Sequence, residues 1–408
     1  MKKISLLVIF ISLFGCKEAL KPENKIKEDV AFLTDDKLEG RQTGSEGEKL
    51  AADYIVERFK KLGLSPKGTE GYLQPFNFVP KAHPHAKVTY REINSDSTIT
   101  GTNVLAYIDN KAENTIIIGA HYDHLGYGGE GSLYRGEEKL IHNGADDNAS
   151  GVSVMLNLAS KLRNTNTSNN YLFMAFSGEE IGLLGSNFFV KNATLELENV
   201  NYMINMDMVG KLKEDKSLAV YGTGTAAVWT KTIDSLNTGF KLIKKESGVG
   251  PSDHTSFYLS DIPVLHFFTG QHKDYHKPTD DAELLNYEGM YAISDYLFKI
   301  ISDLDNKEKL VFKKTKNETR KGGGFKVTLG VIPDYLFDGK GLRIDGVTDD
   351  KPAHKAGIVK GDIVIKMGDI KVEGMMDYVK SLSKFEKGAT TKVIVLRDGK
   401  EIEVTVTF

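Results

Sequence analysis

The sequence predicts an α/β protein with a mostly parallel central sheet covered by helices, followed by a small β-rich C-terminal domain. Three observations lead to this fold class. Between residues 100 and 302, short apolar runs alternate with helical patterns, as in parallel sheets covered on both faces. Beyond about residue 325 the pattern changes to short alternating runs with one helical stretch. The length of 408 residues exceeds what a single core usually supports, which favours two domains.

The overall composition is typical of a globular protein and excludes one class of partner. Hydrophobic residues make up 40% of the chain and charged residues 27%. The 53 Lys and Arg residues nearly balance the 56 Asp and Glu residues, giving a net charge of -3. Because a nucleic-acid-binding surface needs an excess of positive charge, we expect no nucleic acid partner.

The N-terminus has the pattern of a secretion signal. Met1-Lys2-Lys3 is positively charged, and the apolar run 4–14 that follows is too short to span a bilayer. Leu13-Phe14-Gly15-Cys16 resembles a bacterial lipoprotein signal, in which cleavage before the cysteine leaves a lipidated N-terminus. We therefore expect 1–16 to be a lipoprotein signal peptide and lipid on Cys16 to anchor the protein in the bacterial cell envelope, at the periplasmic or the surface face. The alternative is an ordinary secretory signal with an incidental cysteine.

A helix is expected before the alternating region. Ser45-Glu46-Gly47-Glu48 has the form of a capping box, and apolar residues follow it at helical spacing as far as Leu62. In the alternating region we expect strands at 104–108, 115–119, 171–176, 202–206 and 263–268, and helices at 151–163, 223–236 and 284–302.

Residues 303–322 lose periodicity and are expected to form a linker that ends in a run of glycines. The boundaries that follow are a first domain at 26–302 and a second at 323–408. In the second domain we expect strands at 325–331, 341–346, 362–367, 391–396 and 401–407, and a helix at 375–384.

Metal-binding side chains follow several of the expected strands. Five short segments of the first domain carry histidines or carboxylates: His121 to Asp123, Asp146-Asp147, Glu179-Glu180, Asp207, and Tyr275-His276. In open α/β sheets, ligands bind beyond the carboxyl ends of the strands, where these residues are expected. Imidazole nitrogen and carboxylate oxygen suit zinc and several other divalent metals, and the absence of thiolates argues against a closed structural zinc site.

These segments resemble the zinc aminopeptidases of peptidase family M28, motif by motif, over roughly residues 30 to 302. The resemblance implies a zinc-aminopeptidase-like fold, two Zn²⁺ ions, and peptide substrates. It implies these roles: metal ligands His121, Asp147, Glu180, Asp207 and His276, with Asp147 as the bridge; Glu179 as general base; and Asp123 as the residue that orients His121. One zinc would be held by His121, Asp147 and Asp207, and the other by Glu180, Asp147 and His276.

Two side chains near these residues have alternative roles. Tyr275 matches a tyrosine that some members of the family use to stabilise the oxyanion, and the alternative is that it only packs on the wall of the site. His124 is close to His121 in sequence and could line the pocket, but we expect it at the protein surface.

The absence of arginine from one part of the chain indicates which reaction of the family to expect. No arginine occurs between Arg163 and Arg320, a span that contains Glu179, Asp207 and His276. Because arginine is the best side chain for gripping a free α-carboxylate, its absence favours an aminopeptidase over a carboxypeptidase or dipeptidase of the same family. A lysine, or Arg135 in its loop, could substitute for that arginine, so the carboxypeptidase or dipeptidase stays an alternative. Glutaminyl cyclases of this fold use a single zinc, and the presence of both His121 and Asp207 favours two.

The C-terminal segment resembles a bacterial PDZ domain. The resemblance rests on Thr328-Leu329-Gly330-Val331 and on the stretch 353–364. It implies that Leu329, Gly330 and Val331 form a loop that captures the C-terminal carboxylate of a bound peptide. The alternatives are a stabilising appendage without a ligand, or a catalytically silent protein that acts only through its PDZ-like groove.

Overall fold

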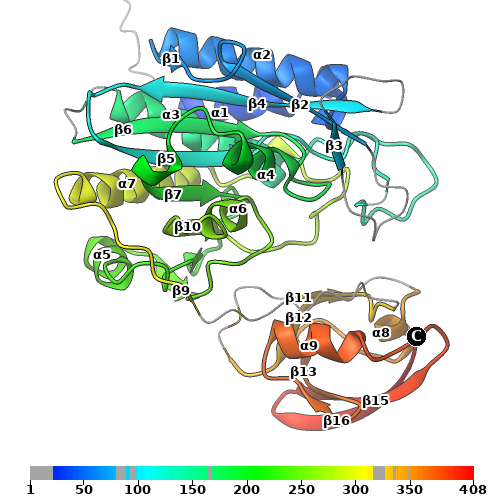
Figure 1. Cartoon of the computed structure of the whole chain (residues 1–408). Coiled ribbons are helices and arrows are strands. Elements are labelled where there is room, and N and C mark those ends of the chain that lie inside the picture. The colour runs from blue at the N-terminus through cyan, green and yellow to red at the C-terminus, as the bar shows by residue number, and fades with distance from the viewer. Residues whose placement is uncertain are drawn as a thin grey trace, which may run out of the picture.

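The computed structural model shows two domains joined near residue 315 (Figure 1). The structure describes residues 22–79, 89–91, 98–129, 131–163, 165, 168–315, 327–333, 337, 339–347 and 350–408. The expected signal peptide with Cys16 and the glycine run of the linker lie outside these residues. In the part of the chain that is described, no helix combines the length and the apolarity needed to cross a membrane.

The first domain is built on a ten-stranded mixed sheet with the strand order β3-β2-β4-β6-β5-β7-β10-β8-β9, and β1 pairs with β4. The strands are β1 (Ser65–Pro66), β2 (Leu73–Val79), β3 (Thr89–Arg91), β4 (Ile99–Ile108), β5 (Asn114–His121), β6 (Asn169–Phe176), β7 (Val200–Met206), β8 (Ser217–Tyr221), β9 (Lys241–Lys244) and β10 (Val264–Phe268).

The parallel part of this sheet lies at its centre. Strands β6, β5, β7 and β10 are neighbours and run parallel, so their carboxyl ends meet at one edge. On one flank β2, β3 and β4 pair antiparallel, and on the other β10 pairs antiparallel with β8. The expected α/β fold with a covered central sheet is confirmed, and the sheet is parallel mainly in the part that carries the metal-binding segments.

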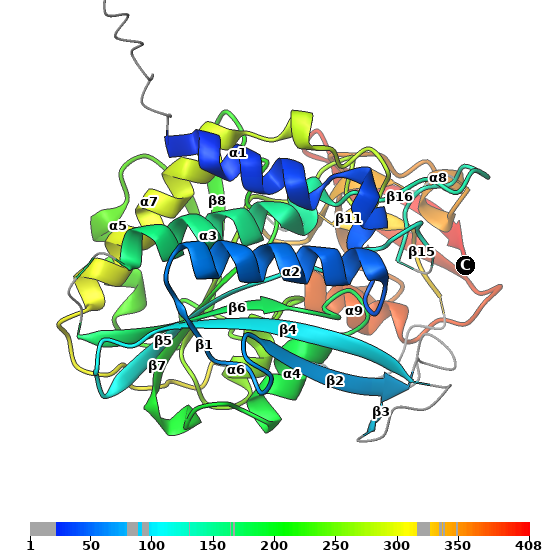
Figure 2. The same cartoon turned by 90° about the horizontal axis from the view of Figure 1, so that it is seen from above.

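Helices cover both faces of the sheet, which explains why the central strands are mostly apolar. Helices α1 (Pro22–Leu33), α2 (Glu46–Lys61), α3 (Gly151–Leu162), α5 (Trp229–Leu236) and α7 (Tyr287–Leu304) lie on one side, and α4 (Leu184–Lys191) and α6 (His254–Tyr258) on the other (Figure 2). Along β5, Ile116 and Ile118 join the core under α3, whereas Ile117 joins the core on the opposite face. A strand with both faces buried favours a nearly continuous run of apolar residues.

Helix α2 begins as the capping box predicts, with one difference. The Ser45 side chain accepts a hydrogen bond from the amide of Glu48 at 3.1 Å. The Glu48 carboxylate accepts from the amide of Gly44 at 2.5 Å, one residue before the position expected for a capping box. Glu48 also accepts a hydrogen bond from the hydroxyl of Ser177, which lies just after β6. The first turn of α2 is thereby tied to the edge of the sheet where the parallel strands end.

Part of the expected linker lies against the first domain. Beyond the end of α7, the amide of Leu310 donates to Asn201 at 2.9 Å, and the amide of Lys313 donates to the carbonyl of Thr225 at 2.7 Å. The hydroxyls of Thr315 and Tyr258 are 2.9 Å apart. The chain is therefore held to the first domain as far as Thr315.

The second domain is a six-stranded antiparallel sheet with two short helices. The strand order is β11-β12-β13-β15-β16, and β14 pairs with β13. The elements are β11 (Val331–Pro333), β12 (Leu342–Val347), α8 (Pro352–Lys355), β13 (Ile363–Met367), β14 (Ile370–Lys371), α9 (Met375–Leu382), β15 (Thr390–Arg397) and β16 (Lys400–Thr407). Strand β11 is at the edge of the sheet and lies on the side that faces the first domain (Figure 1).

Candidate metal centre

Four parallel strands deliver the side chains of the candidate site. His121 is the last residue of β5, Glu179 and Glu180 follow β6, and Asp207 follows β7 directly. His276 lies in the loop after β10, and Asp147 lies in the turn 145–150 that leads into α3. Because these strands are neighbours in the sheet, residues far apart in the sequence meet at one edge.

The first group of possible ligands consists of His121, Asp147 and Asp207. The Nε2 atom of His121 lies 3.2 Å from Oδ1 of Asp147 and 3.4 Å from Oδ1 of Asp207. One donor atom from each of the three residues lies within 4.8 Å of the others, close enough to hold a single ion. The sequence expectation named the same three residues.

The second group contains Asp147, Glu180 and two histidines. The Nε2 atom of His276 lies 3.1 Å from Oδ2 of Asp147 and 3.2 Å from Oε2 of Glu180. Nδ1 of His124 lies 2.7 Å from Oε1 of Glu180 and 4.0 Å from Oδ2 of Asp147. The expectation that His124 is at the surface is wrong, because its side chain is buried beside Glu180. Its position directly after the His-x-Asp motif was the one available signal.

Asp147 lies between the two groups. Its Oδ1 faces His121 and its Oδ2 faces His276, each at hydrogen-bonding distance. The carboxylate of Asp280 fixes the turn by accepting from the amides of Asp146 at 2.9 Å and Asp147 at 3.0 Å. The neighbouring Asp146 points elsewhere, since its carboxylate accepts from the amide of Gly210 at 2.6 Å. One carboxylate with its two oxygens facing two different histidines is the arrangement that a bridge between two ions requires.

Asp123 connects the first group to Glu179. One of its oxygens accepts from the hydroxyl of Thr43 at 2.9 Å, and the other accepts from the amide of Glu179 at 3.1 Å. The latter oxygen lies 3.7 Å from Nδ1 of His121, and the same nitrogen is 3.2 Å from the carbonyl of Asp123. The buried carboxylate therefore holds the backbone at Glu179 while it faces the outer nitrogen of His121.

The electrostatics of the site favour a bound cation. Burial lowers the pKa of His121, but the charges of Asp207 and Glu179 outweigh it and hold this pKa well above its ordinary value. Burial likewise opposes ionisation of Glu180, yet the charge of His276 lowers the pKa of that carboxyl to about 2. Several ionised carboxylates gathered in a buried place repel one another unless positive charge accompanies them. The donor set, imidazole and carboxylate without thiolate, fits zinc, and the structure thus has suitable residues for it.

Glu179 stands apart from both groups of ligands. Burial raises the pKa of the Glu179 carboxyl well above its ordinary value, and the nearby charges of Asp207 and Asp253 raise it further against the opposing charge of His121. Neither group of possible ligands includes Glu179. Its carboxyl is therefore near the ions' expected place without being needed to hold them.

Arg41 stabilises the backbone of the candidate site, and no sequence signal pointed to it. The Arg41 side chain is almost completely buried. Its guanidinium group donates to backbone carbonyls of three separate segments, at Leu33, Tyr122, Asn143 and Gly144. Tyr122 lies between His121 and Asp123, and Gly144 precedes the turn of Asp147. Arg41 thus fixes two ligand-bearing segments relative to each other.

The fold and the donor set define the class of this protein: an α/β protein with a candidate metal centre where its parallel strands end. Residues 103–301 match the model of peptidase family M28, and residues 310–408 match that of the PDZ domain. The resemblance of the sequence to an M28 peptidase with a C-terminal PDZ domain is therefore confirmed.

Curated relatives include named aminopeptidases. The chain is 35% identical over 171 residues to the alkaline phosphatase isozyme conversion protein of Escherichia coli (strain K12), covering 41% of this chain and 46% of that protein. It is 29% identical to aminopeptidase YwaD of Bacillus subtilis (strain 168), covering 49% and 43%. It is 30% identical to a probable leucine aminopeptidase of Trichophyton verrucosum (strain HKI 0517), covering 49% and 54%. The chain thus spans about half the length of these relatives.

Solved structures share the fold of the first domain. An aminopeptidase from Aneurinibacillus sp. strain AM-1 superposes with a TM-score of 0.52 at 18% identity, over 72% of this chain and 96% of that one. Porphyromonas gingivalis glutaminyl cyclase superposes with a TM-score of 0.53 at 18% identity, over 69% and 98%. At such identities the likeness establishes the fold alone, so the reaction must be argued from the site.

Proposed function

We propose that this chain is a metallo-aminopeptidase with a co-catalytic pair of zinc ions, which removes N-terminal residues from peptides. The observation that carries the proposal is the position of Asp147, whose two oxygens face His121 and His276. Asp207 would complete the first zinc site, and Glu180 would complete the second. A cyclase with a single zinc would not need both groups, which argues against that activity.

The reaction assigned to the site uses the residues in distinct ways. Bound zinc would lower the pKa of a water molecule and polarise the scissile carbonyl. The backbone amide of Glu179 donates a hydrogen bond to Asp123, which holds Glu179 in place. The Glu179 carboxylate would accept the proton of the attacking water and pass it to the leaving amine. Tyr275 precedes His276, and its ring stacks on the imidazole with a centroid distance of 3.8 Å. Its phenol would donate a hydrogen bond to the oxyanion.

The test is the comparison of wild type with Glu179→Gln for metal content and for hydrolysis of aminoacyl amides. We expect both proteins to retain two equivalents of zinc. Glu179→Gln should lose at least about a hundredfold in kcat, since general base catalysis contributes about that much or more. Tyr275→Phe should retain zinc and lose activity less severely.

Three outcomes would contradict the proposal in different ways. If the protein cleaved peptides with a blocked N-terminus but did not cleave peptides with a free N-terminal amine, the site would be assigned to a carboxypeptidase. One zinc per chain would remove the bridging role of Asp147. Absence of any peptide hydrolysis by the wild type would favour a protein that acts only by binding peptides through its PDZ domain.

We further propose that lipid on Cys16 anchors the enzyme in a bacterial cell envelope. The support is the sequence pattern 1–16 described above. Fractionation of cells that express wild type or Cys16→Ser tests it. Wild type should be recovered with membranes, and the variant should be recovered in the soluble fraction. Equal distribution of the two proteins would contradict the proposal.

A further inference from the structure

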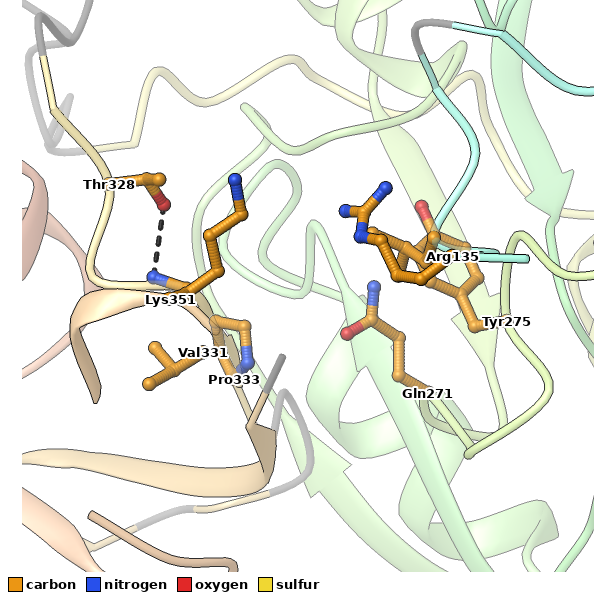
Figure 3. A pocket seen from close by; sticks show the side chains of 9 residues that line it. Arg135, Gln271, Tyr275, Thr328, Val331, Pro333 and Lys351 are labelled. Atoms are coloured by element: carbon orange, nitrogen blue, oxygen red, sulfur yellow. Dashed lines mark hydrogen bonds between the residues drawn. The ribbon is translucent and has the colours of Figure 1, made fainter. Parts of the chain in front are cut away.

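A pocket lies between the two domains (Figure 3). Its volume is about 330 Å³, at the low end for small-ligand pockets, so it suits a short ligand. Its wall in the peptidase domain is formed by Leu133, Arg135, Gln271 and Tyr275, and its wall in the PDZ domain by Thr328, Gly330, Val331, Pro333 and Lys351.

The peptidase wall of this pocket is continuous with the candidate metal ligands. Tyr275 lines the pocket and is followed directly by His276. The amide of Leu133, also in the wall, donates to the carbonyl of His276 at 2.9 Å. Nδ1 of His276 in turn lies 2.8 Å from the carbonyl of Gly131. The pocket wall and His276 therefore belong to the same two contacting segments, 131–135 and 275–276.

The PDZ wall contains the loop expected to capture carboxylates. Gly330 has a φ of 75°, a conformation that favours glycine, and it directly precedes the edge strand β11. Its amide donates to the hydroxyl of Thr328 at 3.1 Å, a bond that a bound carboxylate could replace (Figure 3). The side chain of Leu329 is buried in the core of the PDZ domain. The loop thus presents its backbone, and not its leucine, to the pocket.

Two cationic side chains face this pocket from opposite walls. Figure 3 shows Lys351 on the PDZ side and Arg135 on the peptidase side, with the amide of Gln271 below them. Arg135 donates to the carbonyl of Ser132 in its own loop at 3.2 Å. Among the residues that the structure describes, neither cation forms an ion pair with a carboxylate. An anionic ligand group would meet two charges and the amide of Gly330.

We propose that this pocket binds the C-terminal carboxylate of short peptides whose N-terminal residue lies at the metal centre. The PDZ domain then supplies one end of the substrate site, and the distance between the two domains selects peptides of a few residues. The inference rests on the proposed aminopeptidase activity and adds the substrate class.

The test compares kcat/KM for tripeptides with a free C-terminal carboxylate and for the same tripeptides with a C-terminal amide. The wild type should prefer the free acid by roughly tenfold or more, because hydrogen bonds to a charged group are worth about that much. In the double variant Arg135→Ala/Lys351→Ala, the ratio of kcat/KM for the free acid to kcat/KM for the amide should fall towards one. Extending the peptides to ten residues should also bring it towards one in the wild type.

The matched control removes two exposed cations outside the pocket. Lys139 lies in the same loop region as Arg135, and Lys355 ends the helix that follows Lys351. Lys139→Ala/Lys355→Ala should keep the wild-type preference. Equal rates on acid and amide, or a preference that survives Arg135→Ala/Lys351→Ala, would overturn the inference and leave the aminopeptidase proposal intact. Failure to hydrolyse any peptide or aminoacyl amide would overturn both.

Discussion

The imidazole Nδ1 of His124 lies 2.7 Å from Oε1 of Glu180, while the other oxygen of this carboxylate lies 3.2 Å from His276. The Nε2 atom of His124 is buried and has no hydrogen-bond partner among the described residues. His124 therefore holds one oxygen of Glu180 and leaves the second oxygen directed towards the candidate second metal. This contact can position Glu180, and His124 itself lies close enough to Asp147 and Glu180 to hold an ion together with them.

Replacement of His124 by phenylalanine tests that role. His124→Phe keeps a planar ring but removes the hydrogen bond to Glu180, so the second zinc should bind about 10 to 100 times more weakly. Zinc titration with a competing chelator measures the two affinities, and circular dichroism checks the fold. We expect the affinity of the first site to change much less.

The control for this variant is another buried histidine. His142 contacts the hydroxyl of Ser132 at 2.7 Å and does not belong to either group of possible ligands. His142→Phe should leave both zinc affinities near those of the wild type. Unchanged zinc binding in His124→Phe would show that Glu180 keeps its orientation without the imidazole.

The sequence predicted the centre of the fold well because its signals there are local. The strand expected at 202–206 is Val200–Met206, and the helix expected at 151–163 is Gly151–Leu162. The strand is a largely apolar run, and the helix has apolar residues at helical spacing. By contrast, β2 (Leu73–Val79) was not predicted, because it contains Pro75 and Asn77 and takes part in the sheet through long-range pairing with β4.

In the candidate site, too, some residues were predicted from the sequence and others were not. His121, Asp147 and Asp207 could be named because each belongs to a recognisable motif after a strand. Arg41 could not be named, since its partners are backbone carbonyls that only the folded chain brings together. The sequence predicted the PDZ loop that contains Gly330 and Val331. It could not predict that this loop lies opposite Arg135, because that depends on how the two domains are placed.

Arg41→Lys should destabilise the peptidase domain. Burial lowers the pKa of the Arg41 guanidinium to about 10, with the charge of Asp123 opposing this. A lysine starts from a lower pKa than arginine, so the same burial would disfavour its charged form more strongly. Lysine also lacks the planar fork and would leave some of the carbonyls at Tyr122, Asn143 and Gly144 unpaired. We expect the free energy of unfolding to fall by about 2–4 kcal/mol, as measured by urea denaturation.

Arg163→Lys is the matched control for the loss of a guanidinium group. Arg163 also donates to a backbone carbonyl, that of Leu62 at 2.8 Å, but its side chain is exposed. Its replacement should change the free energy of unfolding by less than about 0.5 kcal/mol. Equal effects of the two variants would mean that the buried guanidinium does not hold the ligand-bearing segments together.

Glu48 should make the stability of the peptidase domain fall as the pH rises. Burial raises the pKa of the Glu48 carboxyl from an ordinary 4.5 to about 8, although hydrogen bonds from Ser177 and Gly44 favour its charged form. Between these two values the folded state holds more protons than the unfolded state, so stability is highest below about pH 4.5 and is lost towards pH 8. The loss should be on the order of a few kcal/mol.

Glu48→Gln should remove this pH dependence, because the amide can accept from Gly44 and donate to Ser177 without a charge. Urea denaturation of zinc-loaded wild type and variant between pH 5 and pH 8 measures the free energy of unfolding. The difference in this free energy between the two proteins reports on Glu48, because the metal ligands are the same in both. The variant should gain stability relative to wild type as the pH rises. Glu46→Gln, exposed in the same helical turn, should show no such trend. A constant difference between Glu48→Gln and wild type across this range would mean that Glu48 is ionised in the folded protein at neutral pH.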